Sequence, residues 1–182
     1  MTSTRQMAAR AVIVGIIGYA FVIGFYAAID LFAGRSLLHT GSLLAEAFFR
    51  RVYDPSALAL MSIDTEALIR HNLMHLSVSV TIGFIVIGLV EDAIRNPWKS
   101  RFILFTFFLG FMVTVAAMTV LTDPIRSSIP LWSIIVSNVG SAAIAGWAIL
   151  SWYPGLRNVF SASSAVVEAQ AEPLAGRTKI DR

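Results

Sequence analysis

Cysteine is absent from this chain of 182 residues, and charged residues make up only 14% of it. Without cysteine there are no disulfides, no thiolate metal sites and no cysteine nucleophiles. Soluble domains carry about 25% charged residues, so this chain has too little polar surface to face water on all sides. Hydrophobic residues make up 57%, and the mean hydropathy is +0.74. The composition therefore predicts a protein whose main solvent is the lipid bilayer.

The chain also lacks a strong excess of charge and any catalytic motif. The formal net charge is only +3 and the basic residues are scattered, so no nucleic-acid partner is expected. There is no Gly-rich phosphate loop and no defensible Ser/His/Asp arrangement. Ionisable groups inside membrane spans usually mark a transport path, and the interiors of the apolar stretches lack such a path. Neither an enzyme nor a transporter is the expected function.

Four long stretches without charge dominate the chain. They lie between these pairs of charged residues: Arg10 and Asp30, Arg70 and Glu91, Arg101 and Asp123, and Arg126 and Arg157. A helix of about 20 residues crosses a hydrocarbon core about 30 Å thick, and in lipid a helix satisfies its own backbone. We therefore predict an all-α integral membrane protein, a bundle of four transmembrane helices within residues 11–156. The predicted spans are about 11–30, 70–92, 101–122 and 131–153.

The connection between the first two spans is too long for a plain helix-to-helix link, which usually takes about 2–8 residues. We predict that residues 31–63 form an interfacial cap of one or two short helices. Thr40 is the predicted N-cap of the first, which ends at Arg50 and Arg51. Asp54, followed by proline, opens the second. Asp64 is the predicted N-cap of the second span.

The distribution of Lys and Arg predicts the orientation of the bundle. Of the 14 basic residues, nine fall on the side that holds both termini and five on the other side. The positive-inside rule then places both termini in the cytoplasm and the chain in the cell membrane, an inner membrane in bacterial terms. Residues 1–10 form a cytoplasmic segment. Residues 157–182, rich in small and polar residues, form a flexible C-terminal tail.

Small residues repeat every fourth position in three of the four spans. Such a spacing lets helix backbones approach closely, and this close packing replaces the hydrophobic force that lipid abolishes. We interpret these rows as helix-packing faces, within the chain or against another subunit, whereas Val90 is expected to face lipid. The rows are Ala20, Gly24 and Ala28; Thr106, Gly110 and Thr114; and Ser137, Ser141 and Ala145.

His71 and His75 form the one constellation with ligand character. Positions four apart lie about 40° apart around a helix, so both imidazoles point the same way at the end of the second span. His39, in the cap, is the third histidine and is expected on the same side of the membrane. Histidines at the end of a span are more often structural, with a hydrogen bond to a carbonyl or to water. We take that structural interpretation as the first expectation.

Three kinds of ligand remain as alternatives for the histidine pair at this end of the second span. Zinc or copper needs a third protein ligand, for which His39 is the best placed. Haem is less suitable, because two side chains on one helix face cannot bind opposite sides of one haem plane. A quinone headgroup near Tyr26 needs only a hydrogen bond. The expected function is a non-catalytic membrane subunit or accessory protein, without a cofactor, that packs against other subunits or itself. The alternative is a metal- or cofactor-binding membrane protein that uses the His pair.

Overall fold

The computed structural model describes residues 3–51 and 63–156, and over these ranges it contains helices and no strand. The long elements are α1 (Thr4–Phe32), α2 (His39–Phe49), α4 (Thr65–Arg95), α5 (Ser100–Leu121) and α6 (Leu131–Trp152). Single turns of 3-10 helix, η1 (Pro97–Lys99) and η2 (Asp123–Ile125), flank α5. Four helices (α1, α4, α6, and α5 with η1) are long and apolar enough to cross a membrane. The chain is thus a multi-pass, all-helical membrane protein, which confirms the predicted fold class.

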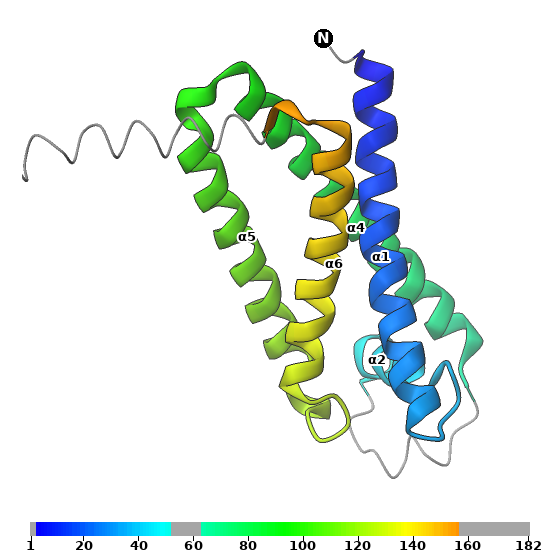
Figure 1. Cartoon of the computed structure of the whole chain (residues 1–182). Coiled ribbons are helices and arrows are strands. Elements are labelled where there is room, and N and C mark those ends of the chain that lie inside the picture. The colour runs from blue at the N-terminus through cyan, green and yellow to red at the C-terminus, as the bar shows by residue number, and fades with distance from the viewer. Residues whose placement is uncertain (1–2, 52–62, 157–182) are drawn as a thin grey trace, which may run out of the picture.

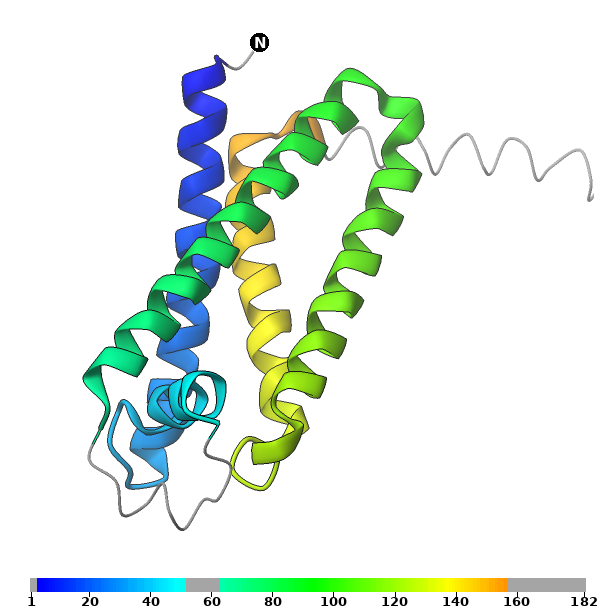
Figure 2. The same ribbon diagram turned by 180° about the vertical axis from the view of Figure 1, so that it is seen from behind.

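The two ends of the bundle are clearly different (Figures 1 and 2). The N-terminus of α1, η1 and the C-terminal end of α6 lie at one end, which we call the η1 end. Helix α2, the start of α4 and η2 lie at the other, which we call the α2 end. In both views α5 runs along the edge of the bundle. Of the four spans, it makes the fewest contacts with the other helices in the described part of the chain.

Two of the spans, α1 and α4, begin earlier than the apolar stretches that predicted them, whereas α6 begins at Leu131 as predicted. Ser3 accepts a hydrogen bond from the backbone N–H of Gln6, whose side chain in turn accepts from the N–H of Ser3. This capping box starts α1 well before residue 11. Likewise α4 begins at Thr65, because Asp64 accepts a hydrogen bond from the N–H of Ala67. The prediction that Asp64 is the N-cap of the second span is confirmed, and the polar residues before the hydrocarbon core are helical.

Helix α2 is the described part of the predicted cap. Its N-cap residue is Leu38 and not Thr40, because Thr40 lies inside the first turn and uses its hydroxyl elsewhere. The prediction that Thr40 caps this helix is therefore wrong. Leu44 and Ala47 of α2 pack in a cluster with Ile125 of η2 and residues at the start of α6. The helix predicted from Asp54 and the tail at 157–182 lie outside the described residues.

Most of the buried apolar side chains fall into two clusters, one at each end of the bundle. At the η1 end, α1, α4, α5 and α6 all contribute, among them Val14, Ile87, Ile103 and Ile149. Val90 belongs to this cluster and is only 2% exposed, so the expectation that it faces lipid is wrong. At the α2 end the smaller cluster joins α2, η2 and α6. Each end is therefore held by its own core.

Candidate functional site

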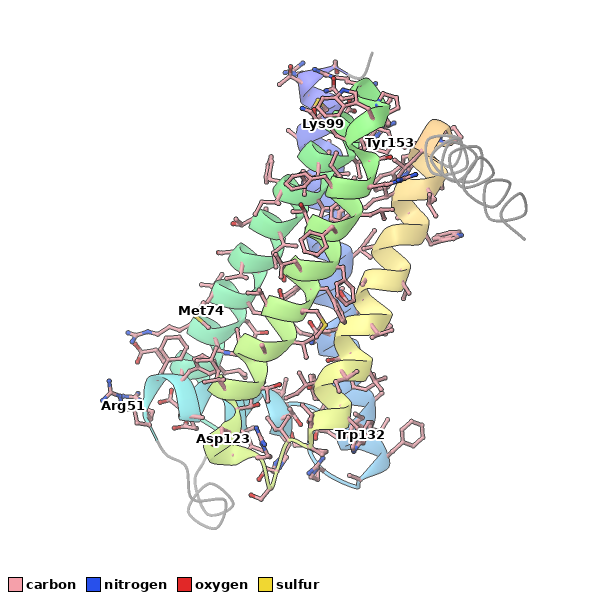
Figure 3. All side chains as sticks on the ribbon, turned by 90° about the vertical axis from the view of Figure 1, so that its left-hand side faces the viewer. Arg51, Met74, Lys99, Asp123, Trp132 and Tyr153 are labelled. Carbon is pink, nitrogen blue, oxygen red and sulfur yellow. The ribbon has the colours of Figure 1, made fainter. Side chains whose placement is uncertain are left out.

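The predicted histidine pair lies on α4 near the α2 end. The ring centroids of His71 and His75 are 6.2 Å apart, and His71 is buried. Met74, between them in sequence, is labelled in Figure 3 on the same side of the bundle as Arg51. The helical spacing therefore does bring both imidazoles to one face, as the sequence predicts.

Side chains from two other helices enclose the pair. Tyr19 of α1 packs edge-to-face on His75, with ring centroids 5.3 Å apart. Its hydroxyl donates a hydrogen bond of 3.1 Å to Oδ1 of Asn72, whose amide nitrogen donates to the carbonyl of Leu68. Phe48 of α2 lies 5.8 Å from the ring of His71. The residues around the pair are therefore mainly aromatic, with one interhelical hydrogen bond, from Tyr19 to Asn72.

One polar atom of the pair lacks a protein partner. Nδ1 of His71 is buried and has no hydrogen-bond partner in the structure. A buried polar atom without a partner costs about 1–3 kcal/mol, so such an atom is a candidate contact for a ligand. A neutral imidazole nitrogen can accept a hydrogen bond or bind a metal ion. The tyrosine beside the pair is Tyr19; Tyr26 instead lies with its hydroxyl 3.5 Å from that of Ser133.

The third predicted ligand does not complete a metal site in the described part of the chain. His39 begins α2, and its backbone N–H donates to the carbonyl of Ser36. Among residues 3–51 and 63–156, no three His, Asp or Glu side chains gather closely enough to hold a metal ion. The pair by itself supplies two nitrogen ligands from one helix face, which is fewer than a structural zinc site uses.

The three rows of small residues have different surroundings. On α6, Ser137 is buried, and Ala145 packs against the core at the η1 end. The hydroxyl of Ser141 donates to the carbonyl of Gly18 of α1. On α1, Ala20, Gly24 and Ala28 are all exposed. On α5, Thr106 and Thr114 bond to carbonyls of their own helix, and Gly110 is exposed. Among the residues that the structure describes, the α6 row is therefore the one that clearly contacts another helix.

The tightest contact between α1 and α4 is made by residues outside these rows. A Cβ atom at Gly15 would lie 2.5 Å from the Cα of Val80. A Cβ atom at Gly83 would lie 2.2 Å from the carbonyl oxygen of Ala11. The sequence does contain the spacing typical of such a contact, because Ala11 and Gly15 are four residues apart, as are Ser79 and Gly83. The same spacing occurs at other positions on α1, so spacing alone does not identify the residues that make this contact.

A second group missed by the sequence analysis joins the end of α1 to the start of α2. Asp30 is fully buried and accepts hydrogen bonds from the backbone N–H and the hydroxyl of Thr40, at 2.7 and 2.8 Å. The Arg35 guanidinium pairs with the same carboxylate at 3.0 Å. These contacts satisfy a buried carboxylate near the membrane boundary, where an unpaired charge would be costly. Asp30 therefore acts as a structural anchor of α2.

Comparison of the chain with protein-family models, with curated proteins and with solved structures finds no match.

Proposed function

We propose that this chain is a non-catalytic integral membrane subunit or accessory protein, and that α5 packs against another membrane protein or a second copy of the chain. The proposal rests on one observation: in the middle of the membrane, one face of α5 has no neighbouring helix from the described part of the chain packed against it. In the most apolar stretch of each span, 6% of the η1–α5 segment is buried, against 11% for α1, 17% for α4 and 28% for α6. A span with so few neighbours has room for a helix from another chain.

Residues 103, 107, 110 and 114 share this face of α5. Ile103 is 2% exposed, and Phe107 packs against the same core at the η1 end. At Gly110, one turn further along, an added Cβ atom would meet no heavy atom within 4 Å. Thus the face is packed where α5 begins and open in the middle of the membrane.

Exposure of apolar side chains to lipid is by itself ordinary for a span. In lipid, however, helices associate through close van der Waals packing, and small residues allow the closest approach. Gly110 places such a residue on α5, between Thr106 and Thr114, at a position where an added Cβ atom would meet nothing within 4 Å. This is the composition expected of a contact with a partner helix, and it supports a subunit role more than a catalytic one.

A photo-crosslinking experiment in native membranes tests the proposal. The photoreactive residue benzoylphenylalanine is placed at Val113, one turn from Gly110, or at Val78 of α4 as a matched control. Both valines are exposed, by 59% and 51%. We expect a discrete protein adduct from position 113, at least several-fold stronger than from position 78.

The variant Gly110→Leu, combined with the probe at position 113, provides the second arm. A leucine fills the space beside Gly110 that a partner backbone would occupy. Because an added Cβ atom there meets nothing within 4 Å, we expect the chain's own fold to be unaffected. The adduct should therefore be lost although the protein remains folded and inserted. Equal adducts from both positions, or an adduct that survives Gly110→Leu, would contradict the proposal.

The second candidate function is binding of a metal ion, haem or quinone by His71 and His75. It is favoured by the buried, unpartnered Nδ1 of His71. Because no group of three metal-binding side chains forms in the described part of the chain, a metal would need a further ligand from outside the described residues. A quinone would need only a hydrogen-bonding group at the rim.

Native purification with optical and elemental analysis distinguishes the two candidates. Under the cofactor hypothesis, metal, haem or quinone co-purifies with the chain, and His71→Ala and His75→Ala each remove it. His39→Ala serves as the control for a histidine outside the pair. A wild-type chain that purifies with protein partners and without any of these ligands would exclude the cofactor hypothesis, and so would a ligand that stays bound in both His71→Ala and His75→Ala.

For localisation we propose the cell membrane, with both termini in the cytoplasm. The described residues carry five basic side chains at each end of the bundle. The proposed orientation therefore depends on the basic residues that follow α6, of which Arg157 is nearest to the span.

A further inference from the structure

A pocket of about 230 Å³ opens at the α2 end, between the end of α1, the α1–α2 link and the start of α6. Ile29 and Ile129 supply apolar wall, and Tyr26 and Ser133 supply hydroxyl groups. Trp132 also lines the pocket and is 56% exposed, and Figure 3 labels it at the α2 end. Tryptophan is typical of the membrane interface, so the pocket lies where headgroups meet hydrocarbon.

Arg35 is the one charged residue among the described residues that line the pocket. Its terminal nitrogen pairs with Asp30, but its Nε is buried and has no hydrogen-bond partner. The guanidinium therefore has a donor that the protein leaves unused. The carboxylate of Asp30 is occupied by Arg35 and by both hydrogen bonds from Thr40, so it is not free to bind a cation.

The start of α6 adds a second positive feature. Pro130 is the N-cap of this helix of 22 residues and provides no side-chain cap. Pro130, Trp132 and Ser133 line the pocket, so the uncapped N-terminus of α6 opens at its wall. A helix N-terminus carries about half a positive charge and favours anions.

We propose that this pocket binds the anionic headgroup of an amphiphile, a phosphate or carboxylate whose oxygens accept from Arg35 and the start of α6. Pockets for whole drug-sized ligands measure about 300–1,000 Å³, so a smaller pocket suits a headgroup. The apolar walls and Trp132 then contact the first part of the acyl chain. The same chemistry would also accept free phosphate, which the test separates from a lipid.

The test uses the full chain in zwitterionic nanodiscs and follows tryptophan fluorescence on titration. The probes are inorganic phosphate, short-chain phosphatidylglycerol and short-chain phosphatidylcholine of the same chain length. We expect phosphatidylglycerol to bind at least ten-fold more tightly than phosphatidylcholine. Trp132→Phe should abolish the signal. If inorganic phosphate binds as tightly as phosphatidylglycerol, the pocket is a site for a free anion, and the proposal that it binds an amphiphile is wrong.

Two variants in one turn form a matched pair. Ser128 lines the pocket, whereas its neighbour Ser127 does not and is exposed. Ser128→Asp places a negative charge in the pocket and should weaken phosphatidylglycerol binding at least ten-fold, while Ser127→Asp should leave it unchanged. Neither variant replaces Asp30 or Arg35, so the ion pair that anchors α2 keeps both of its residues. Equal affinity for the two lipids, or equal effects of the two aspartates, would overturn the proposal.

Discussion

Gly15 and Gly83 bring the backbones of α1 and α4 into direct contact. Each faces backbone atoms of the other helix, which cannot move aside as a flexible side chain does. This contact is made near the middle of both spans, where lipid provides no hydrophobic force to hold helices together. At these two positions the absence of a side chain is what allows the packing.

Gly83→Ala is therefore expected to destabilise the protein. The new methyl group would lie 2.2 Å from the carbonyl oxygen of Ala11, and overpacking of this kind costs about 1–3 kcal/mol. The midpoint of thermal unfolding in detergent measures the effect. Gly88→Ala is the matched control, since a Cβ there meets nothing within 4 Å and alanine favours a helix. Equal midpoints for the two variants would contradict the close contact.

Asp30 provides a second prediction at the residue scale. Asp30→Asn removes the charge that Arg35 and Thr40 surround, and breaking a buried ion pair costs about 3–5 kcal/mol. Because Arg35 is one-third exposed, we expect a loss near the lower value, about 3 kcal/mol, in chemical unfolding. Asp123→Asn breaks the exposed pair with Arg126 and should cost less than about 1 kcal/mol. Similar losses in both variants would refute the anchoring role of Asp30.

At the scale of the elements, a charged pair adds to the packing contacts between α2 and α4. The Arg50 guanidinium donates to Asp64 through two nitrogens, at 2.9 and 2.6 Å. The N–H of Ala67 and then Arg50 lower the pKa of the Asp64 carboxyl below its ordinary value. Asp64 thus serves both as the N-cap of α4 and as the partner that ties the end of α2 to it.

This junction should weaken in acid. A carboxyl whose pKa is lowered by folding adds stability at pH values above its ordinary pKa. That stability is lost as the pH falls below about 4 and passes through the lowered value. Thermal midpoints of the wild type and of Asp64→Asn, measured between pH 6 and pH 3, should therefore converge. A difference that stays constant over that range would show that the charge of Asp64 contributes nothing.

At the scale of the whole molecule, four spans place both described chain ends on one side. Figure 3 shows Lys99 and Tyr153 at the η1 end, and Trp132, Asp123 and Arg51 at the opposite end. Alternation of the spans requires this arrangement whichever way the bundle is inserted. The direction in which the bundle is inserted depends on the Lys and Arg residues in its loops.

Reporter fusions test the proposed direction. Fusions after Trp98 and at the C-terminus should give cytoplasmic reporter activity, and a fusion after Ser127 should give the activity of the opposite side. The reason is the excess of basic residues on the side of the termini, with the tail included. The reverse pattern would invert the orientation and leave the four-span fold unchanged.

The fold class and the spans were predictable because their causes are local. Lipid requires about 20 uncharged residues in a helix, and that requirement is visible in any single stretch of the chain. The N-cap at Asp64 is equally local, since its side chain bonds to Ala67 only three residues away. The sequence by itself therefore determined the number, the class and the approximate position of the spans.

Which residues meet was decided only by the tertiary structure. Small residues four apart occur on several faces of α1, and no local signal shows that Gly15 meets α4 while Gly24 stays exposed. Thr40 is a residue type typical of an N-cap, but in the fold it bonds to Asp30, ten residues earlier in the chain. The Arg35 pocket likewise combines three separate segments, so its existence depends on long-range packing that spacing along the chain cannot specify.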